Sequence, residues 1–199
     1  MRIEDIATHP DFVRLSSLAG IRVDLRYATT GNFVGRNLYG DLDCAWLHRD
    51  AARGLTQAVR WLAKMHPGLQ LCVLDALRPH RVQVQLWDHL AGTPLRQYLA
   101  DPARGSIHSF GMAVDATLLD DCGRALDMGT AFDDLTRLSH PQFEDEYLAQ
   151  GQLTTAQISH RNLLRQALLN NGFSGIATEW WHFDFGDRIK VRQDYLRIA

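Results

Sequence analysis

The sequence lacks several features that would mark particular classes of protein. None of its apolar runs approaches the roughly 18 residues of a membrane-spanning helix, and its 199 residues contain no internal repeat or low-complexity tract. Neither charge is in excess, because 21 Lys and Arg face 23 Asp and Glu, for a formal net charge of -2. The basic residues are scattered along the chain, so neither nucleic acid nor an anionic membrane is expected as a main partner.

Cysteine is also scarce. Cys44, Cys72 and Cys122 are an odd number at wide spacings, and no CxxC pair suggests a metal clip or a redox motif. They are predicted to be small core residues in a reducing compartment. The first residues, MRIEDIATHPDF, carry acids where a signal peptide needs an apolar core. A cytoplasmic location is therefore predicted.

The apolar content predicts one sizeable core. With 46% hydrophobic residues in 199, a single domain over residues 1–199 is expected. Apolar residues recur every three or four positions from Arg49 to Met65, which predicts a helix. Pro79 is expected to open a second helix that ends near Gly92, and Thr155 to cap a third that runs to Leu169.

The predicted strands are separated irregularly by these helices. Alternating or continuous apolar residues predict strands over 21–27, 69–74, 111–119 and 178–185. A doubly wound sheet would need a helix after nearly every strand, and this order does not supply one. The predicted class is α+β, a mainly antiparallel sheet with helices packed on one side.

One buried-looking strand contains an acid. The stretch SIHSFGMAVDATL places Asp115 among apolar residues, seven positions after His108. An ionised carboxylate in an apolar interior costs several kcal/mol or more unless a cation or a full set of donors compensates it. A cation is therefore expected beside Asp115, and Gly111 would let backbone pass close to the site.

The stretch EWWHFDF supplies further ligand types. If His182 converges with His108 and Asp115, two imidazoles and one carboxylate make a set that zinc accepts, with a fourth position open for water. Glu179, three residues before His182, could then act as general base, provided that it sits at a bend or strand end. Each residue alone also has a structural interpretation, such as a hydrogen-bonding histidine or a capping aspartate. Spacing leaves both interpretations open.

Together these stretches resemble a known family. SIHSFGMAVD has the form SxHxxGxAxD and EWWH has the form ExxH, as in the zinc-dependent D-alanyl-D-alanine dipeptidases of the peptidase M15 family. The resemblance extends through most of the chain, in the stretches RYATTGNF, DALRP, DMGTAFD and LSH. It implies the α+β fold that these peptidases share with the Hedgehog amino-terminal domain.

The resemblance also implies a catalytic centre with one zinc ion per chain. His108, Asp115 and His182 match the family's zinc ligands, and Glu179 matches its general base and acid. Arg78, in the stretch DALRP, is similar to the group that stabilises the developing oxyanion. These residues imply hydrolysis of D-Ala-D-Ala by metal-activated water.

Further matches imply substrate contacts. Asp133 resembles the anchor for the substrate's amino group, and Ser106 a contact to its carboxylate end. Tyr27, Asn32 and Phe33 fall in a segment that is expected to line the pocket. His140 is followed by Pro141 where the family has a second histidine, so His140 is expected to make an ordering hydrogen bond and not to bind the metal.

Two alternatives stay open from the sequence. One is a cell-wall D,D-carboxypeptidase or endopeptidase on the same scaffold, which would usually need export. The other is a non-catalytic, zinc-stabilised binding domain, for which Glu179 and Arg78 together would have no use. A small dipeptide is the expected substrate partner, and the sequence makes no prediction of oligomeric state.

Overall fold

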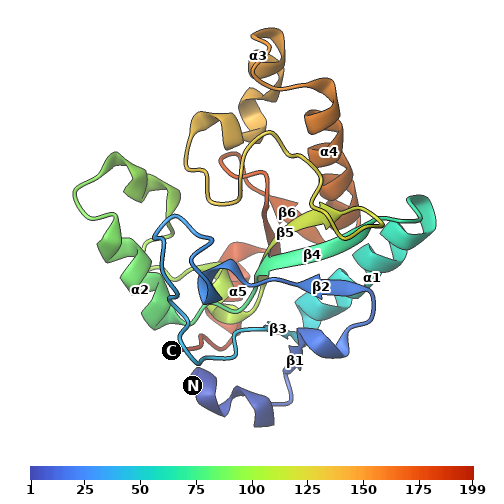
Figure 1. The fold of residues 1–199 in the computed structure, drawn as a ribbon. Coiled ribbons are helices and arrows are strands. Elements are labelled where there is room, and N and C mark those ends of the chain that lie inside the picture. The colour runs from blue at the N-terminus through green and yellow to red at the C-terminus, as the bar shows by residue number, and fades with distance from the viewer.

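A computed structural model describes all 199 residues and centres on a five-stranded sheet (Figure 1). The strand order is β2-β4-β5-β7-β6; β2 pairs parallel with β4, and the other three pairings are antiparallel. The strands are β2 (Ile21–Val23), β4 (Gln70–Asp75), β5 (Ala113–Leu119), β6 (Phe173–Gly175) and β7 (His182–Phe185). A separate antiparallel pair joins β1 (Phe12–Arg14) to β3 (Trp46–His48). The predicted α+β class with a mainly antiparallel sheet is confirmed.

Two long helices cover one face of this sheet. The helices α1 and α4 contact each other, α1 contacts β4 and β7, and α4 contacts β5 and β6. The remaining helices lie around the sheet, with α2 at one side in Figure 1 and α5 near the centre of the view, where it packs against the 3-10 turn η5 (Ile107–Phe110). The helices are α1 (Arg49–Met65), α2 (His80–His89), α3 (Glu144–Ala149), α4 (Thr155–Leu169) and α5 (Arg188–Asp194).

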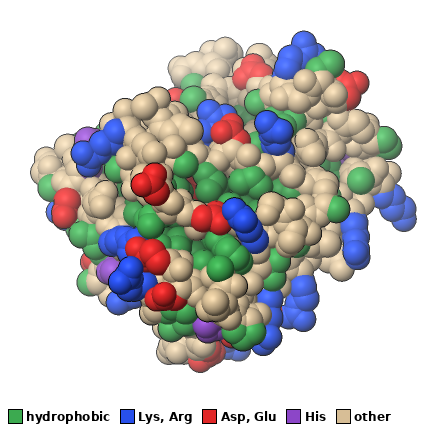
Figure 2. Space-filling view, turned by 60° about the horizontal axis from the view of Figure 1, so that its bottom comes forward, with side chains coloured by type: hydrophobic (Ala, Val, Ile, Leu, Met, Phe, Trp, Pro, Cys, Tyr) green, Lys and Arg blue, Asp and Glu red, His purple; other side chains and the backbone are tan.

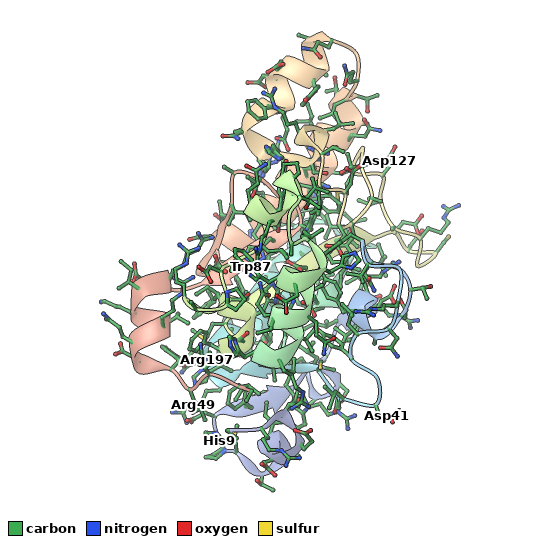
Figure 3. The ribbon with its side chains drawn as sticks, turned by 90° about the vertical axis from the view of Figure 1, so that its left-hand side faces the viewer. His9, Asp41, Arg49, Trp87, Asp127 and Arg197 are labelled. Carbon is green, nitrogen blue, oxygen red and sulfur yellow. The ribbon has the colours of Figure 1, made fainter.

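Short 3-10 turns connect these elements. One of them, η5, carries the SIHSF stretch, and η4 lies between it and α2. The turns are η1 (Ile3–Thr8), η2 (Leu15–Ser17), η3 (Arg26–Ala28), η4 (Pro94–Tyr98), η5 (Ile107–Phe110), η6 (Arg137–Ser139) and η7 (Pro141–Phe143). In Figure 3, His9 and Asp127 lie toward opposite ends of the molecule, with Trp87 of α2 between them.

The strand β5 separates the core from the opposite face of the sheet. Because side chains alternate along a strand, Val114 and Ala116 enter the main hydrophobic cluster with Leu55 of α1 and Leu164 of α4. Full burial of each such leucine contributes about 1.5–3 kcal/mol. Asp115 points to the other face, and is nevertheless buried. The opposite face therefore has to supply partners for a buried carboxylate.

Several predicted boundaries are wrong by a few residues. The predicted strand 178–185 is a strand only from His182, since Trp180 and Trp181 lie in bends. Both indole rings are buried, at 88° to each other, whereas neighbours in a regular strand point to opposite faces. The predicted strand 21–27 ends at Val23 and is followed by the turn η3.

Other predictions differ in detail. The helix over Arg49–Met65 is confirmed with its predicted bounds. The cap of α4 is Thr154, not Thr155, in a capping box with Gln157. Cys122 is exposed, which contradicts its assignment to the core, while the other two cysteines are buried. None of the helices has the length and apolar character that crossing a membrane requires.

The surface carries charges of both signs. In Figure 2, acidic and basic side chains are interspersed over the face shown, with hydrophobic side chains between them. This distribution agrees with the nearly balanced composition of the sequence.

Candidate active site

Three candidate metal ligands meet on the sheet face opposite α1 and α4. His108 comes from η5, and Asp115 and His182 are direct cross-strand partners on β5 and β7. Their ligand atoms all lie within 4.8 Å of one another. His182 Nδ1 lies 3.0 Å from Asp115 Oδ1 and 3.1 Å from His108 Nε2. The predicted convergence of the three residues is confirmed.

The turn that carries His108 depends on Gly111. This glycine has φ +65°, and a Cβ there would lie 2.8 Å from the backbone nitrogen of His48. That nitrogen donates a hydrogen bond to the Gly111 carbonyl at 2.8 Å. The close approach of the β3–α1 junction and the left-handed backbone together require glycine at this position.

Hydrogen bonds at the outer ring nitrogens orient both histidines. His108 Nδ1 lies 2.7 Å from the Ala76 carbonyl, and His182 Nε2 lies 2.9 Å from Asp184 Oδ1. Because a carbonyl or carboxylate oxygen can only accept, the bonded nitrogens carry the protons. The inner nitrogens, His108 Nε2 and His182 Nδ1, face the Asp115 carboxylate, and each would offer a lone pair to a bound cation that replaced the hydrogen bond between His182 Nδ1 and Asp115 Oδ1. This donor set fits a divalent cation.

The charges of the cluster agree with this assignment. Burial opposes ionisation of Asp115, but His108 and His182 lower the pKa of its carboxyl group. Burial likewise opposes protonation of His182, but the carboxylates of Asp184 and Asp115 raise its pKa. The two carboxylates therefore favour positive charge at the centre, whether it is carried by a proton or by a metal ion.

Glu179 lies beside this cluster, as the sequence requires. Glu179 lies in the irregular segment before β7, so its side chain is not confined to the opposite face from His182 as it would be in a regular strand. Together with all three candidate ligands, it lines a cavity of about 340 Å³. Burial raises the pKa of Glu179 to about 7, which is suitable for a group that takes up and returns a proton near neutral pH.

Arg78 enters the same cavity from the end of β4. A register shift between Val73 and Asp75 places Asp75 opposite Asp115, and Arg78 lies between the two carboxylates. Its Nε donates to Asp75 at 2.9 Å, its Nη1 to Gln83 at 3.1 Å and its Nη2 to Asp115 at 3.3 Å. A guanidinium has five N–H donors, so these bonds fix its orientation and leave donors for a bound oxygen.

Asp133 lines another part of the cavity. Its carboxylate accepts from the Tyr27 hydroxyl at 3.1 Å and from the Phe33 backbone nitrogen at 3.4 Å. Burial, and then the charge of Asp115, raise the pKa of Asp133. Asp133 is also the one non-glycine residue with positive φ, at 61°, a conformation that aspartate adopts more readily than most residues. An ionised carboxylate at this place is compensated only by the charge of Arg78 and by these two donors.

Two other predicted substrate contacts differ in position. Ser106 is buried and lines the cavity, and its hydroxyl has no hydrogen-bond partner within the chain. Asn32 is not among the lining residues, unlike Tyr27 and Phe33. Its amide nitrogen donates to the carbonyls of Arg26, Thr29 and Arg36. Asn32 therefore shapes the loop that presents Phe33.

The structure also identifies neighbours of the site that the sequence pattern misses. Tyr98 of η4 lines the cavity, and its hydroxyl lies 2.9 Å from His140 Nε2. The ordering hydrogen bond expected for His140 is confirmed. Asp184 belongs to the EWWHFDF stretch, where its position two residues after His182 was the only signal in the sequence. Arg104 and Arg192 line the cavity from segments without a motif.

The cavity places a candidate His–Asp–His metal site beside a carboxyl group and a guanidinium, the set of groups that a metal-dependent hydrolase requires. The sequence model of the peptidase M15 family, described as D-ala-D-ala dipeptidase, matches residues 9–199. The chain belongs to this family.

Named relatives cover most of the chain. A D-alanyl-D-alanine dipeptidase of Escherichia coli K12 is 37% identical over 164 residues, which are 82% of this chain and 78% of the relative. Another from Synechocystis is 30% identical, over 87% of this chain and 83% of the relative. A third, from Enterococcus faecium, is 29% identical over 84% and 87%.

A solved structure also aligns with the chain. It is described as the LdcB LD-carboxypeptidase in a study of peptidoglycan recognition. The alignment has a TM-score of 0.45 and 14% identity, and it covers 93% of this chain and 72% of that one.

Proposed function

We propose that the protein is a zinc dipeptidase that hydrolyses D-Ala-D-Ala to two molecules of D-alanine. Its family membership supports the substrate class. The observation that carries the mechanism is that the His108–Asp115–His182 cluster, Glu179 and Arg78 line one cavity. A binding domain that used zinc only for stability would not need a carboxylate and a guanidinium beside it.

The three ligands suit one zinc ion per chain. Two imidazole nitrogens and a carboxylate are among the ligands that zinc prefers, and three protein ligands are typical of catalytic sites. A zinc ion held there would polarise the scissile carbonyl and make water a stronger nucleophile. The hydrogen bonds from His108 to Ala76 and from His182 to Asp184 keep both rings oriented for this ion.

Glu179 is proposed to move the proton. It takes a proton from the attacking water and later gives it to the amine that leaves when the peptide bond breaks. A pKa raised by burial to about 7 supports both steps, because the group can be ionised for the first and protonated for the second. One water is consumed, and no covalent enzyme intermediate is needed.

Arg78 is proposed to stabilise the negative charge that develops on the carbonyl oxygen. Its bonds to Asp75, Gln83 and Asp115 hold the guanidinium in place before the substrate binds. Donors that are already oriented need no rearrangement at the transition state, so stabilisation of this kind contributes strongly to the rate of the reaction.

Asp133 is proposed to bind the substrate's ammonium group. The carboxylate has a raised pKa and few donors, so a cation beside it would stabilise its ionised form. Tyr27 and Phe33 support Asp133 and line the cavity beside it, and Ser106, with its free hydroxyl, is proposed as a contact for the substrate's carboxylate end. The single domain over residues 1–199 and the cytoplasmic location stay predictions.

Hydrolysis by metal-depleted and reconstituted protein tests the proposal. After removal of metal is verified by elemental analysis, D-Ala-D-Ala should no longer release D-alanine, and stoichiometric zinc should restore the release. Full activity of the verified metal-free protein would refute the zinc assignment. Efficient release from longer wall peptides would indicate a carboxypeptidase, and zinc binding without any hydrolysis a binding domain.

A further inference from the structure

The active-site cavity has an acidic end. Tyr27 donates to Asp133 at 3.1 Å, and the Arg78 guanidinium lies 4.7 Å from the centre of the Tyr27 ring. Arg78 in turn donates to Asp115 at 3.3 Å. The contacts therefore run from Asp133 through Tyr27 and Arg78 to the metal cluster.

The cavity continues beyond the cluster to a basic end. His182 is bonded to Asp184, which pairs with Arg188 at the start of α5. One turn later on α5, Arg192 Nη1 donates to the Arg188 carbonyl at 3.2 Å. Arg192 lines the cavity together with Arg104. Arg192 is therefore linked to the metal cluster through Arg188 and Asp184, whereas Asp133 is linked to it through Tyr27 and Arg78.

These two arginines have no acidic partner in the chain. Arg188 is paired with Asp184, whereas neither Arg104 nor Arg192 takes part in a salt bridge. Arg192 instead donates from Nε to the Gly105 carbonyl at 3.0 Å, directly before Ser106. Burial, and then the charges of Arg104 and Arg188, lower the pKa of Arg192. Like charges gathered at a hollow favour an anion that fits between them.

We propose that Arg104 and Arg192 form a specificity subsite for the free α-carboxylate of the substrate's second residue. The inference rests on the proposed dipeptidase function and extends it to the other end of the substrate. A zwitterionic dipeptide would place its ammonium group at Asp133 and its carboxylate at the two arginines, with the peptide bond at the metal cluster. The cavity would then select molecules of two residues by charge at both ends.

The two arginines should contribute unequally. Arg192 is partly buried and held by two backbone carbonyls, so its bond to a carboxylate would be charge-assisted and well oriented. Arg104 is exposed and makes no side-chain hydrogen bond, so its contribution is reduced by solvent. We expect a loss of roughly tenfold on removing the Arg192 charge and about threefold on removing that of Arg104.

The experiment compares D-Ala-D-Ala with D-Ala-D-alaninamide, in which the carboxylate is a neutral amide. The native zinc protein should have a kcat/KM at least about tenfold lower for the amide. Arg104→Gln is the cleaner variant because it breaks no bond within the protein, and Arg192→Gln is the stronger one. Both should raise KM for the free dipeptide while kcat changes little, and both should leave the amide almost unaffected.

A matched control is Arg60→Gln, which removes an exposed, unpaired arginine of α1 outside the cavity and should change neither substrate. A second readout does not require turnover: calorimetric titration of metal-free protein with both ligands gives their binding constants. The proposed subsite would be refuted if native protein had the same kcat/KM for D-Ala-D-Ala and for D-Ala-D-alaninamide. It would also be refuted if the ratio of these two values were unchanged in both Arg104→Gln and Arg192→Gln. If native protein cleaves neither substrate, the proposed function fails, and the titrations still decide whether the arginines select a carboxylate.

Discussion

The salt bridge behind His182 should control metal affinity. Asp184 is almost fully buried, accepts a hydrogen bond from His182 Nε2 at 2.9 Å and pairs with Arg188. Burial opposes its ionisation, but His182 and Arg188 lower its pKa to about 2. Asp184→Asn keeps the size of the side chain and removes the charge that fixes the ring and strengthens Nδ1 as a ligand.

Loss of such a partner typically weakens metal binding by roughly 10–100-fold, which corresponds to about 1.4–2.7 kcal/mol. The measurement is a competition titration with a chromogenic chelator of known zinc affinity. The kcat of Asp184→Asn should be low without added zinc and should recover strongly at saturating zinc, because Glu179 and Arg78 are unchanged. The matched control is Asp194→Asn, an exposed aspartate of the same helix as Arg188.

An unchanged zinc affinity in Asp184→Asn, with native-like unfolding, would refute the assignment of Asp184 as the group that orients His182. A variant that binds zinc normally but loses turnover would instead place Asp184 in the proton transfer. Measuring zinc affinity and kcat on the same preparation distinguishes a role in metal binding from a role in proton transfer.

Three further substitutions test individual roles. Glu179→Gln should retain zinc and lose turnover by roughly 10²–10⁴-fold, since the amide cannot accept a proton; zinc lost in parallel would make Glu179 a ligand. Arg78→Ala should lower kcat far more than it raises KM, because the developing charge exists only in the transition state, and a change confined to KM would make it a substrate clamp. Native protein should cleave N-acetyl-D-Ala-D-Ala at least roughly a hundredfold less efficiently than the free dipeptide, and Asp133→Asn should narrow that gap. Equal kcat/KM on the blocked and free substrates would indicate an open groove.

Features encoded by neighbouring residues could be predicted from the sequence. The bounds of α1 follow from a regular apolar period and from the Pro67-Gly68 stop. The need for a positive partner beside Asp115 could be inferred because an acid in a buried strand requires compensation, whereas the convergence of Asp115 with His108 and His182 was implied by the family resemblance. For α1 the physical constraint acts within a few residues of the pattern that reveals it, whereas the contact between His108 and His182 spans 74 positions.

Features that depend on distant contacts could not be predicted. Arg192 acquires its place through a bond to Gly105, 87 positions away, and no spacing encodes that contact. The helix α5 spans only seven residues, too few for a clear apolar period. Asn32 matches a family position near the pocket, but its short amide bonds to the surrounding backbone, as asparagine often does in loops. Only the folded structure shows whether a side chain such as that of Asn32 bonds to nearby backbone or faces the pocket.

The spacing of the candidate ligands has a consequence for the lifetime of the protein. His108 and His182 are 74 positions apart, and the chain between them includes α3 and α4. A metal ion that joins them would act as a removable cross-link, binding the folded chain and not the unfolded one. At a free concentration a thousand times its dissociation constant, it would add about 4 kcal/mol to the free energy of unfolding. Global unfolding, and hence cleavage of the unfolded chain by proteases, would then become rarer as zinc supply rises.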